Sequence, residues 1–242
     1  MAESARRHPF RIGILGGMGP EAGILLQQVI LRETPADKDQ DHLAVVTFTN
    51  PHVPDRTESL AADGGASYLR AVIESLQVLE RAGVDVLVMA CNTAHARLGE
   101  IRCAVSTPVL DMVGLARAEI AAAGGCVGIL ATDGTLNSGL FRVDDGFVET
   151  RNPPEETQRT VMSVIRGTKA GLPADRMVET LREVVSGMLA AGCGRLVLGC
   201  TELSIHHDAL RALHGDIFID PLRLAARRLV AMSREHGSAT AP

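Results

Sequence analysis

The stretch VLVMACNT at residues 86–93 decides the fold, because a similar pattern returns as RLVLGCTE at residues 195–202. Each stretch is an apolar run that ends at a cysteine, and each follows a helical segment ending in Ala-Gly, at residues 82–83 and 191–192. Such runs are typical of strands in a parallel sheet that is covered on both faces. We therefore predict two equivalent strands, each with a cysteine at its carboxyl end.

A second repeat precedes each of these strands in the same order. IGILGGMG at residues 12–19 corresponds to VGILATDG at residues 127–134, an offset of 127 − 12 = 115 residues, and the cysteine strands are offset by 195 − 86 = 109 residues. Two ordered matches at nearly equal offsets indicate two similar halves. We expect an α/β fold of two Rossmann-like parallel-sheet lobes, related by pseudo-twofold symmetry, with the active site in the cleft between them.

The rest of the chain is divided between these lobes. Residues 1–112 plus 216–242 are predicted to form the first lobe, and residues 113–215 the second. The stretch at 217–221 and the helix after it have no counterpart at the end of the first half, so we expect them to pack back onto the first lobe. A chain of 242 residues is long enough for one large α/β domain or two such lobes.

Composition excludes several classes of function. Aromatic residues make up 2% of the chain, and Lys+Arg 24 against Asp+Glu 29 gives a net charge of −5, so neither base stacking nor phosphate-backbone binding is expected. No apolar run is long enough to span a membrane. Five cysteines, an odd number in apolar surroundings, indicate free thiols and a reducing compartment. The Arg6-Arg7 pair is not followed by a cleavable export signal, so we predict a cytoplasmic protein.

The candidate site residues follow the predicted strands. Ligands of open parallel sheets bind outside the carboxyl ends of the strands. This geometry selects the segments 16–19 with Met18, 50–56 with Asn50 and Arg56, 91–93, 132–135 with Thr132 and Thr135, and 200–202. Two facing lobes would bring Cys91 and Cys200 to opposite walls of one cleft. That arrangement suits a reaction with one base on each face of a small planar intermediate.

Both cysteines are predicted to lie in strand-to-helix turns, where a helix N-terminus lowers the thiol pKa, so each is either a thiolate or a thiol near neutral pH. A cysteine after a buried strand is also a common core residue, but two of them at matched repeat positions favour catalysis. Cys103, Cys126 and Cys193 lack such a turn and are interpreted as packing residues.

Each polar residue near these turns has two possible roles, one structural and one in ligand binding. Asn92, Thr93 and Thr201 are suited to cap helices, or to hold a carboxylate together with free backbone N–H groups. Arg56 lies in a proline-stiffened loop, where it is either a carboxylate ligand or a solvated arginine. Lys169 is a weaker candidate, because most lone lysines are surface residues.

Other site types fit less well. The glycines at 13–19 lack the dinucleotide spacing, and no P-loop lysine follows them. Cys91 and His95 have thiol-hydrolase spacing, but no orienting Asp or Asn can be named. No cysteine pair has zinc-ligand spacing, and the adjacent His206 and His207 project to different faces of a helix, so we predict no metal site.

Taken together, the motifs resemble the aspartate/glutamate racemase family, and specifically its aspartate racemase branch. The resemblance covers nearly the whole chain. The matching segments are IGILGGMGP at 12–20, DQDH at 39–42, NPHVPDRT at 50–57, ACNTAH at 90–95, LATDGT at 130–135 and GCTE at 199–202.

The resemblance implies a cofactor-independent racemase of two α/β lobes, which needs no PLP, metal or nucleotide and is commonly a homodimer. By that likeness Cys91 and Cys200 are the two opposing acid/base groups, each serving one enantiomer. Asn92, Thr93, Thr132 and Thr201 would hold the α-carboxylate and neighbouring groups, and Arg56 and Lys169 the side-chain carboxylate. Glu202 follows the second cysteine, where glutamate racemases have His, and this difference favours the aspartate racemase branch.

Departures from the family pattern leave the substrate open. His52 stands where the family often has Gln, and Phe141 replaces a common Tyr. Glutamate or a bulkier amino acid is therefore an alternative to aspartate. Other hypotheses are a related dicarboxylate enzyme, such as a maleate isomerase or a decarboxylase, and a two-lobed binding protein without catalysis. The presence of both cysteines argues against the decarboxylase and against the binding protein without catalysis.

Overall fold

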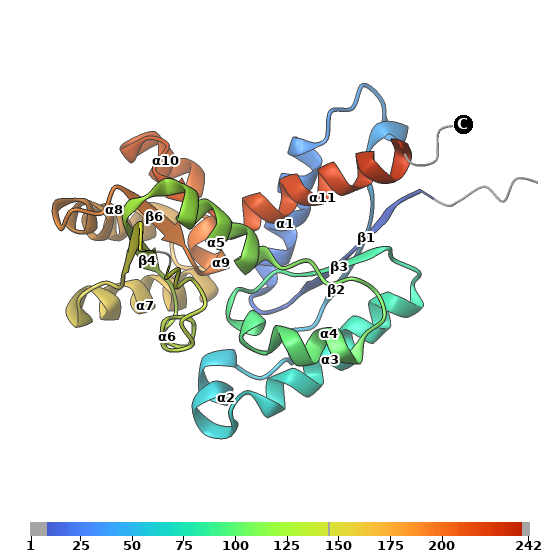
Figure 1. Ribbon diagram of the computed structural model, residues 1–242, viewed down its shortest axis with the longest axis horizontal. Helices are drawn as coiled ribbons and strands as arrows, with labels where there is room; N and C mark the ends of the chain where they lie inside the picture. Colours follow the sequence, from blue (N-terminus) through green and yellow to red (C-terminus); the bar gives the residue numbers. More distant parts are fainter. Residues whose placement is uncertain (1–8, 145, 239–242) are drawn as a thin grey trace, which may run out of the picture.

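Two parallel sheets form the framework of the computed structural model, which describes residues 9–144 and 146–238 (Figure 1). The first sheet has the strand order β2-β1-β3 and the second has the order β5-β4-β6-β7. The strands are β1 (Arg11–Gly16), β2 (Ala44–Thr49), β3 (Val86–Met89), β4 (Gly125–Leu130), β5 (Val148–Arg151), β6 (Arg195–Leu198) and β7 (Phe218–Ile219). The α/β class and the two lobes expected from the sequence are confirmed. The Arg6-Arg7 pair lies outside the described residues.

Helices connect the strands and cover the sheets. They are α1 (Pro20–Glu33), α2 (Arg56–Asp63), α3 (Ala66–Arg81), α4 (Leu98–Ala104), α5 (Met112–Ala123), α6 (Asp133–Asn137), α7 (Glu155–Lys169), α8 (Ala174–Ala190), α9 (Thr201–Ser204), α10 (His207–His214) and α11 (Pro221–Ser238), with short 3₁₀ helices η1 (Asp39–Asp41) and η2 (Thr93–Arg97). None of the helices in the described part of the chain is both long and apolar enough to cross a membrane.

The pairing of the strands reproduces the sequence repeat. β1 pairs with β3 so that Ile12 lies opposite Val86, and β4 pairs with β6 so that Val127 lies opposite Arg195. These four residues begin the four repeated segments, so each half places its glycine-rich turn beside its cysteine turn in the same register. The symmetry inferred from the sequence is therefore present in the hydrogen bonding of the sheets.

The end of the chain differs in part from the predicted division. Phe218 and Ile219 form β7, which pairs with β6 and so belongs to the second sheet rather than to the first lobe. The difference arises because the backbone of this short segment forms hydrogen bonds with the edge of β6 that β4 leaves unpaired. α11 then returns to pack against α1 and α5 (Figure 1). Apart from these two residues, the division at 1–112 plus 216–242 and 113–215 stays a prediction.

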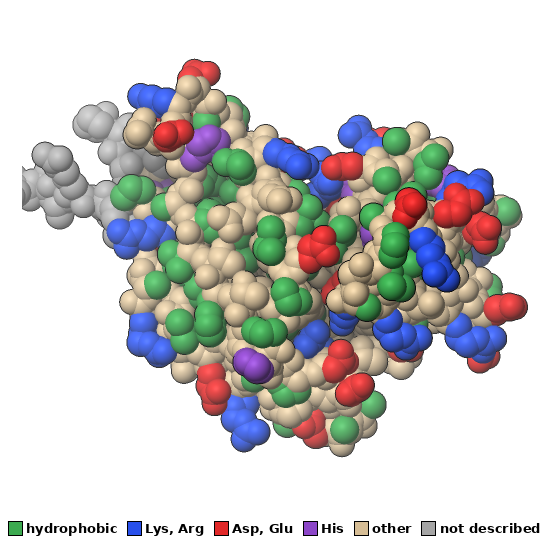
Figure 2. Space-filling model, turned by 180° about the vertical axis from the view of Figure 1, so that it is seen from behind, with side chains coloured by type: hydrophobic (Ala, Val, Ile, Leu, Met, Phe, Trp, Pro, Cys, Tyr) green, Lys and Arg blue, Asp and Glu red, His purple; other side chains and the backbone are tan. Residues whose placement is uncertain are grey.

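Amphipathic helices seal both sheets. In α3 the residues Val72, Leu76 and Leu79 are buried at helical spacing, and they pack with Leu15 and Leu87 of the first sheet. The second sheet is covered by apolar faces of α7 and α8. On the face shown in Figure 2, Lys/Arg and Asp/Glu side chains are interspersed. These cores hold the carboxyl ends of the strands rigidly, which is where the polar side chains gather.

Candidate active site

One pocket collects side chains from the carboxyl ends of both sheets. Cys91 follows β3 and Cys200 follows β6, and both line this pocket between the lobes. The other lining residues are Met18, Asp55, Arg56, Thr57, Asn92, Thr93, Thr132, Lys169, Thr201 and Glu202. The free volume between these side chains is about 20 Å³, room for about one water molecule. The two cysteines therefore lie in a small, polar pocket with little room for solvent.

Cys91 is held by the backbone around it. Its side chain is buried, its N–H donates to Met89 O at 2.8 Å, and its carbonyl lies 2.9 Å from His95 Nδ1. Burial lowers the pKa of His95, so this imidazole is neutral near pH 7. A neutral ring bonded to the Cys91 carbonyl fixes the turn. This contact accounts for His95 as a structural residue rather than as the base of a thiol hydrolase.

Cys200 has a carboxylate of its own. Its Sγ donates a hydrogen bond to Glu202 Oε2 at 2.8 Å, and both side chains are buried. Burial raises the pKa of Cys200 well above its usual value, and the negative charge of Glu202 raises it further. The sequence leaves both protonation states open for this cysteine, and here burial and Glu202 outweigh the N-terminus of α9, which has four residues. Both effects favour the thiol form of Cys200.

Threonine hydroxyls connect the lobes beside the cysteines. Thr93 Oγ1 lies 2.8 Å from Thr135 Oγ1 and 3.2 Å from Thr132 Oγ1, and Thr132 also caps α6 through the N–H of Thr135. Thr201 donates back to Ala90 O at 3.4 Å. The hydroxyl groups of the two sequence repeats thus meet across the lobe boundary. This contact brings the two cysteine turns into one site.

The cationic candidates are placed differently from each other. Arg56 is buried and donates to the carbonyls of Val53, Pro54 and Met18 at 2.9–3.2 Å, which uses three of its five N–H donors. Two donors are left, including a buried Nε. Lys169 is one-third exposed, and its Nζ lies 3.9 Å from both Asp55 Oδ2 and Glu202 Oε1. Arg56 is a fixed wall of the pocket, whereas Lys169 stands at its rim.

Several buried polar atoms of the pocket lack a hydrogen-bond partner among the described residues. They are Nδ2 and Oδ1 of Asn92, Nε of Arg56 and Oε1 of Glu202. An unsatisfied buried polar group costs about 1–3 kcal/mol, so proteins rarely keep four of them together without a use. Both donors and acceptors are among these atoms. The set suits a ligand that carries both acceptors and donors, such as an amino-acid zwitterion.

Most of the predicted site residues come together, and two do not line the pocket. Asn50 donates from Nδ2 to Ser75 Oγ at 2.9 Å and accepts from the N–H of His52, so its side chain holds the loop after β2. Thr135 is buried behind Thr93. Asp55 and Thr57 line the pocket but were not named by the sequence reasoning. Their signal was the Pro-Asp-x-Thr sequence, in which Asp55 Oδ1 caps α2 through the N–H groups of Thr57 and Glu58.

The two departures from the family pattern lie outside the pocket lining. His52 is exposed on the loop after β2. Phe141 is buried against Gly199, where an added Cβ would come within 2.8 Å of the Phe141 ring. Phe141 therefore packs directly behind the residue that precedes Cys200, and it acts on the position of that turn rather than on a ligand.

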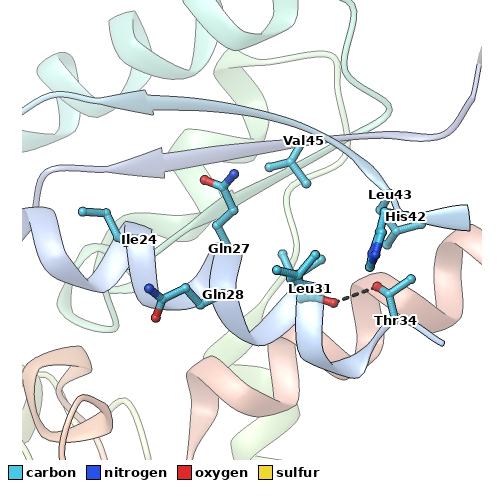
Figure 3. A pocket seen from close by; sticks show the side chains of 9 residues that line it. Ile24, Gln27, Gln28, Leu31, Thr34, His42, Leu43 and Val45 are labelled. Atoms are coloured by element: carbon cyan, nitrogen blue, oxygen red, sulfur yellow. Dashed lines mark hydrogen bonds between the residues drawn. The ribbon is translucent and has the colours of Figure 1, made fainter. Parts of the chain in front are cut away.

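A second hollow lies between α1 and β2 and has a different character (Figure 3). Ile24, Leu31 and Val45 give it an apolar floor, and Gln27 and Gln28 lie on its side. The hydroxyl of Thr34 is already bonded to the Ile30 carbonyl at 2.7 Å. With one imidazole, His42, and no cysteine or carboxylate among its lining residues, this hollow has no paired acid and base. The pocket between the lobes is therefore the candidate active site.

Comparison with known proteins points to one family. A family model described as Asp/Glu/hydantoin racemase matches residues 15–229. The glutamate racemase of Ectopseudomonas mendocina is 32% identical over 212 residues, which cover 80% of this chain and 79% of that enzyme. The glutamate racemase of Deinococcus radiodurans is 35% identical over 156 residues, covering 62% of this chain and 51% of that enzyme, so the match spans about half of that relative. The aspartate racemase of Picrophilus torridus superposes with a TM-score of 0.81 and 27% identity, over 93% of this chain and 94% of that one.

Proposed function

The chain belongs to the Asp/Glu/hydantoin racemase family, and from this membership and the pocket geometry we propose that it is a cofactor-independent amino-acid racemase. The proposed substrate is aspartate or a related acidic amino acid. Cys91 and Cys200 are the proposed acid and base on opposite sides of the substrate. The observation that carries the proposal is that two buried cysteines, one from each lobe, line a single polar pocket.

The reaction needs two groups because inversion requires a proton to leave one face of Cα and another to arrive at the opposite face. In one direction the Cys91 thiolate removes the α-proton and the Cys200 thiol delivers its own. The pair of electrons released from the Cα–H bond is held meanwhile as a carbanion beside the α-carboxylate. Donors placed in a water-poor site stabilise such charge far better than water does. The hydroxyls of Thr93, Thr132 and Thr201 and the unpaired amide of Asn92 are the proposed donors.

Glu202 is the proposed proton acceptor for Cys200. Its Oε2 already accepts the Cys200 S–H at 2.8 Å, so transfer along this hydrogen bond would produce the thiolate needed for the reverse direction. Lys169 lies 3.9 Å from the other oxygen of this carboxylate. Among the described residues no carboxylate accepts a hydrogen bond from Cys91; of the two carboxylates that line the pocket, Glu202 is bonded to Cys200 and Asp55 caps α2. The two cysteines would therefore be recharged by different routes.

An acidic substrate is supported by the charges at the pocket. Arg56 retains two N–H donors, enough for a bidentate contact with a carboxylate, and Lys169 adds a second cation at the rim. The similar proteins are named as glutamate and aspartate racemases, which have substrates of this class. We propose a homodimer as the form in solution, following the family resemblance.

The test is hydrogen exchange at Cα. Purified protein, stripped of metal and without PLP, is incubated in D₂O with L-aspartate and separately with D-aspartate, and deuterium at Cα and optical rotation are followed together. Exchange accompanied by inversion is the expected result. Absence of exchange and of inversion with aspartate, glutamate and a panel of other amino acids would overturn the racemase proposal. Conversion of a dicarboxylate such as maleate would then favour the related isomerase, and binding without conversion a non-catalytic protein.

A further inference from the structure

Two cysteines that the proposed reaction does not use lie against each other in the second lobe. The Sγ atoms of Cys126 and Cys193 are 3.3 Å apart. Cys126 is near the start of β4 and Cys193 precedes β6, and the N–H of Gly194 donates to the Cys126 carbonyl at 2.9 Å. The thiols therefore lie at the amino ends of two hydrogen-bonded neighbouring strands. The candidate active site is at the opposite, carboxyl ends of the same strands.

The two thiols differ in how accessible they are to solvent and to oxidants. Cys193 is 3% exposed and belongs to the core beneath α8, whereas Cys126 is partly exposed at the edge of that core. The guanidinium of Arg151 lies near Cys126, because the pKa of Arg151 is raised by its hydrogen bond to Glu149 and, to a smaller extent, by Cys126. Burial and the neighbouring Cys126 thiol raise the pKa of Cys193 to about 11. An oxidant would thus meet Cys126 first.

We propose that Cys126 and Cys193 are a site of oxidative modification, where a low-molecular-weight disulfide such as oxidised glutathione converts the two thiols into a reversible intrachain disulfide. A disulfide bond is about 2.05 Å long, so the sulfur atoms need to approach by only about 1.2 Å from their present separation. This displacement is within the reach of side-chain rotation, and the backbones are already tied together. The sequence-based interpretation of these cysteines as packing residues covers only their reduced form.

The exchange balances in two steps. The Cys126 thiolate attacks one sulfur of glutathione disulfide, whose S–S bond breaks and releases one glutathione thiolate, leaving a mixed disulfide on Cys126. Cys193 then gives its proton to the released thiolate or to solvent and attacks Sγ of Cys126. The mixed disulfide breaks, and the second glutathione leaves as a thiolate that takes up from solvent the proton Cys126 had released on forming its own thiolate. Two protein thiols are oxidised, and one glutathione disulfide is reduced to two glutathione molecules.

The bond would stabilise the second lobe without altering the pocket. It links residues 67 positions apart, so it removes much of the freedom of the unfolded chain. β4 and β6 are already paired from Val127↔Arg195 to Leu130↔Leu198, so their carboxyl ends need not move. For a chain of this size, a typical disulfide corresponds to a rise in Tm of about 5–10 °C. The rate of the enzyme's own reaction is expected to stay the same.

The sequence makes the test unambiguous, because complete tryptic cleavage puts each of the five cysteines on a different peptide. Reduced wild-type protein is treated with glutathione disulfide, alkylated, digested without reduction and analysed by mass spectrometry. The expected result is a cross-link between peptides 118–142 and 183–195 that dithiothreitol removes, together with the rise in Tm. A Cys126→Ala variant should lose both, and a Cys103→Ala variant, which removes an exposed thiol, should keep both.

Three outcomes would overturn the proposal. These are cross-links that join other peptides instead, Cys126 capped by glutathione beside a free Cys193, and a cross-linked protein whose Tm is unchanged. If Cys126→Ala does not fold, the peptide map of the wild-type protein and its reversal by dithiothreitol still decide the question.

Discussion

The two cysteine turns have the same backbone origin and different chemical surroundings. Cys91 and Cys200 follow strands that pair in the same register with the glycine-rich strand of their own lobe. After Cys91 comes Asn92, whose amide is buried and unpaired, whereas Glu202 lies two residues after Cys200 and accepts a hydrogen bond from its Sγ at 2.8 Å. The repeat thus fixes where the sulfur atoms are. The side chains that follow each cysteine influence its pKa and its proton-transfer partner.

This difference shows that two lobes with the same backbone arrangement can surround equivalent cysteines with different side chains. In the proposed mechanism the enzyme works in both directions, and each direction begins with one cysteine deprotonated and the other protonated. Burial and Glu202 raise the pKa of Cys200 and so favour its thiol form. The following predictions test this asymmetry, starting with the largest effect.

Removing either sulfur should remove the reaction. We expect Cys91→Ser and Cys200→Ser each to lower kcat for racemisation by about 10³-fold or more, because a hydroxyl is a much poorer base and positioned acid–base groups contribute about 10²–10⁴-fold. The rate is measured by optical rotation with both enantiomers. Cys103→Ser, at an exposed site, is the control and should be unchanged. Racemisation by either single variant at near the wild-type rate would disprove the two-base assignment.

Removing the charge of Glu202 should affect one cysteine only. Since the carboxylate raises the pKa of Cys200, Glu202→Gln should lower that pKa and move the midpoint of Cys200 alkylation to lower pH. We also expect kcat to fall about 10–100-fold, because the proton acceptor is lost. Alkylation is followed peptide by peptide across pH. Glu183→Gln, at an exposed carboxylate, should do neither, and a Cys200 midpoint that stays or rises would contradict the role given to Glu202.

Breaking the threonine contact should loosen the lobes. Thr93→Val removes the hydroxyl that lies 2.8 and 3.2 Å from Thr135 and Thr132, which remain bonded to each other at 3.0 Å. We expect a loss of about 1–2 kcal/mol in the free energy of unfolding, measured by urea denaturation. Thr160→Val, whose hydroxyl bonds to Glu156 O on a helix surface, is the matched control. Equal effects of the two variants would show that the contact between the lobes adds no stability.

Histidines in both lobes should make the fold sensitive to mild acid. Burial lowers the pKa of His95, after Cys91, and of His206, after Cys200. The unfolded chain binds these protons near pH 6.5 and the folded chain does not, so stability is full above that pH and falls below it. The slope is at most about 1.4 kcal/mol per pH unit for each histidine. Urea denaturation from pH 7.5 to 5.5 measures it, and His95→Gln should flatten the curve. An unchanged slope in that variant would rule His95 out as a contributor.

Much of the fold was predictable because the repeat specifies it locally. The apolar runs ending at Cys91 and Cys200 set the strand pairing, and the same residues led to most of the pocket. The sequence placed Phe218 and Ile219 with the first lobe, whereas β7 pairs with β6 of the second sheet. Two residues are too few to show a periodic pattern, so their pairing depends on the free edge of β6. Asn50 was expected at the site, but Ser75, which is distant in sequence, captures its amide.

The charge state of Cys200 was the least predictable feature. A helix N-terminus and a neighbouring carboxylate act on a thiol in opposite directions, and the sequence contains both. Which one wins depends on the rotamer of Glu202 and on complete burial, and both are set by packing between the lobes. Spacing along the chain indicates the two candidate cysteines, whereas their protonation states depend on tertiary contacts.

The pocket between the cysteines has free volume for about one water molecule, so a substrate can enter only if the side chains that line it move apart. If the contact of Thr93 with Thr132 and Thr135 breaks to admit substrate, product would leave by the same motion. Such opening is often slower than chemistry in enzymes with enclosed sites. Turnover would then respond to solvent viscosity, and the residues that govern speed would lie at the seam between the lobes rather than at the sulfur atoms.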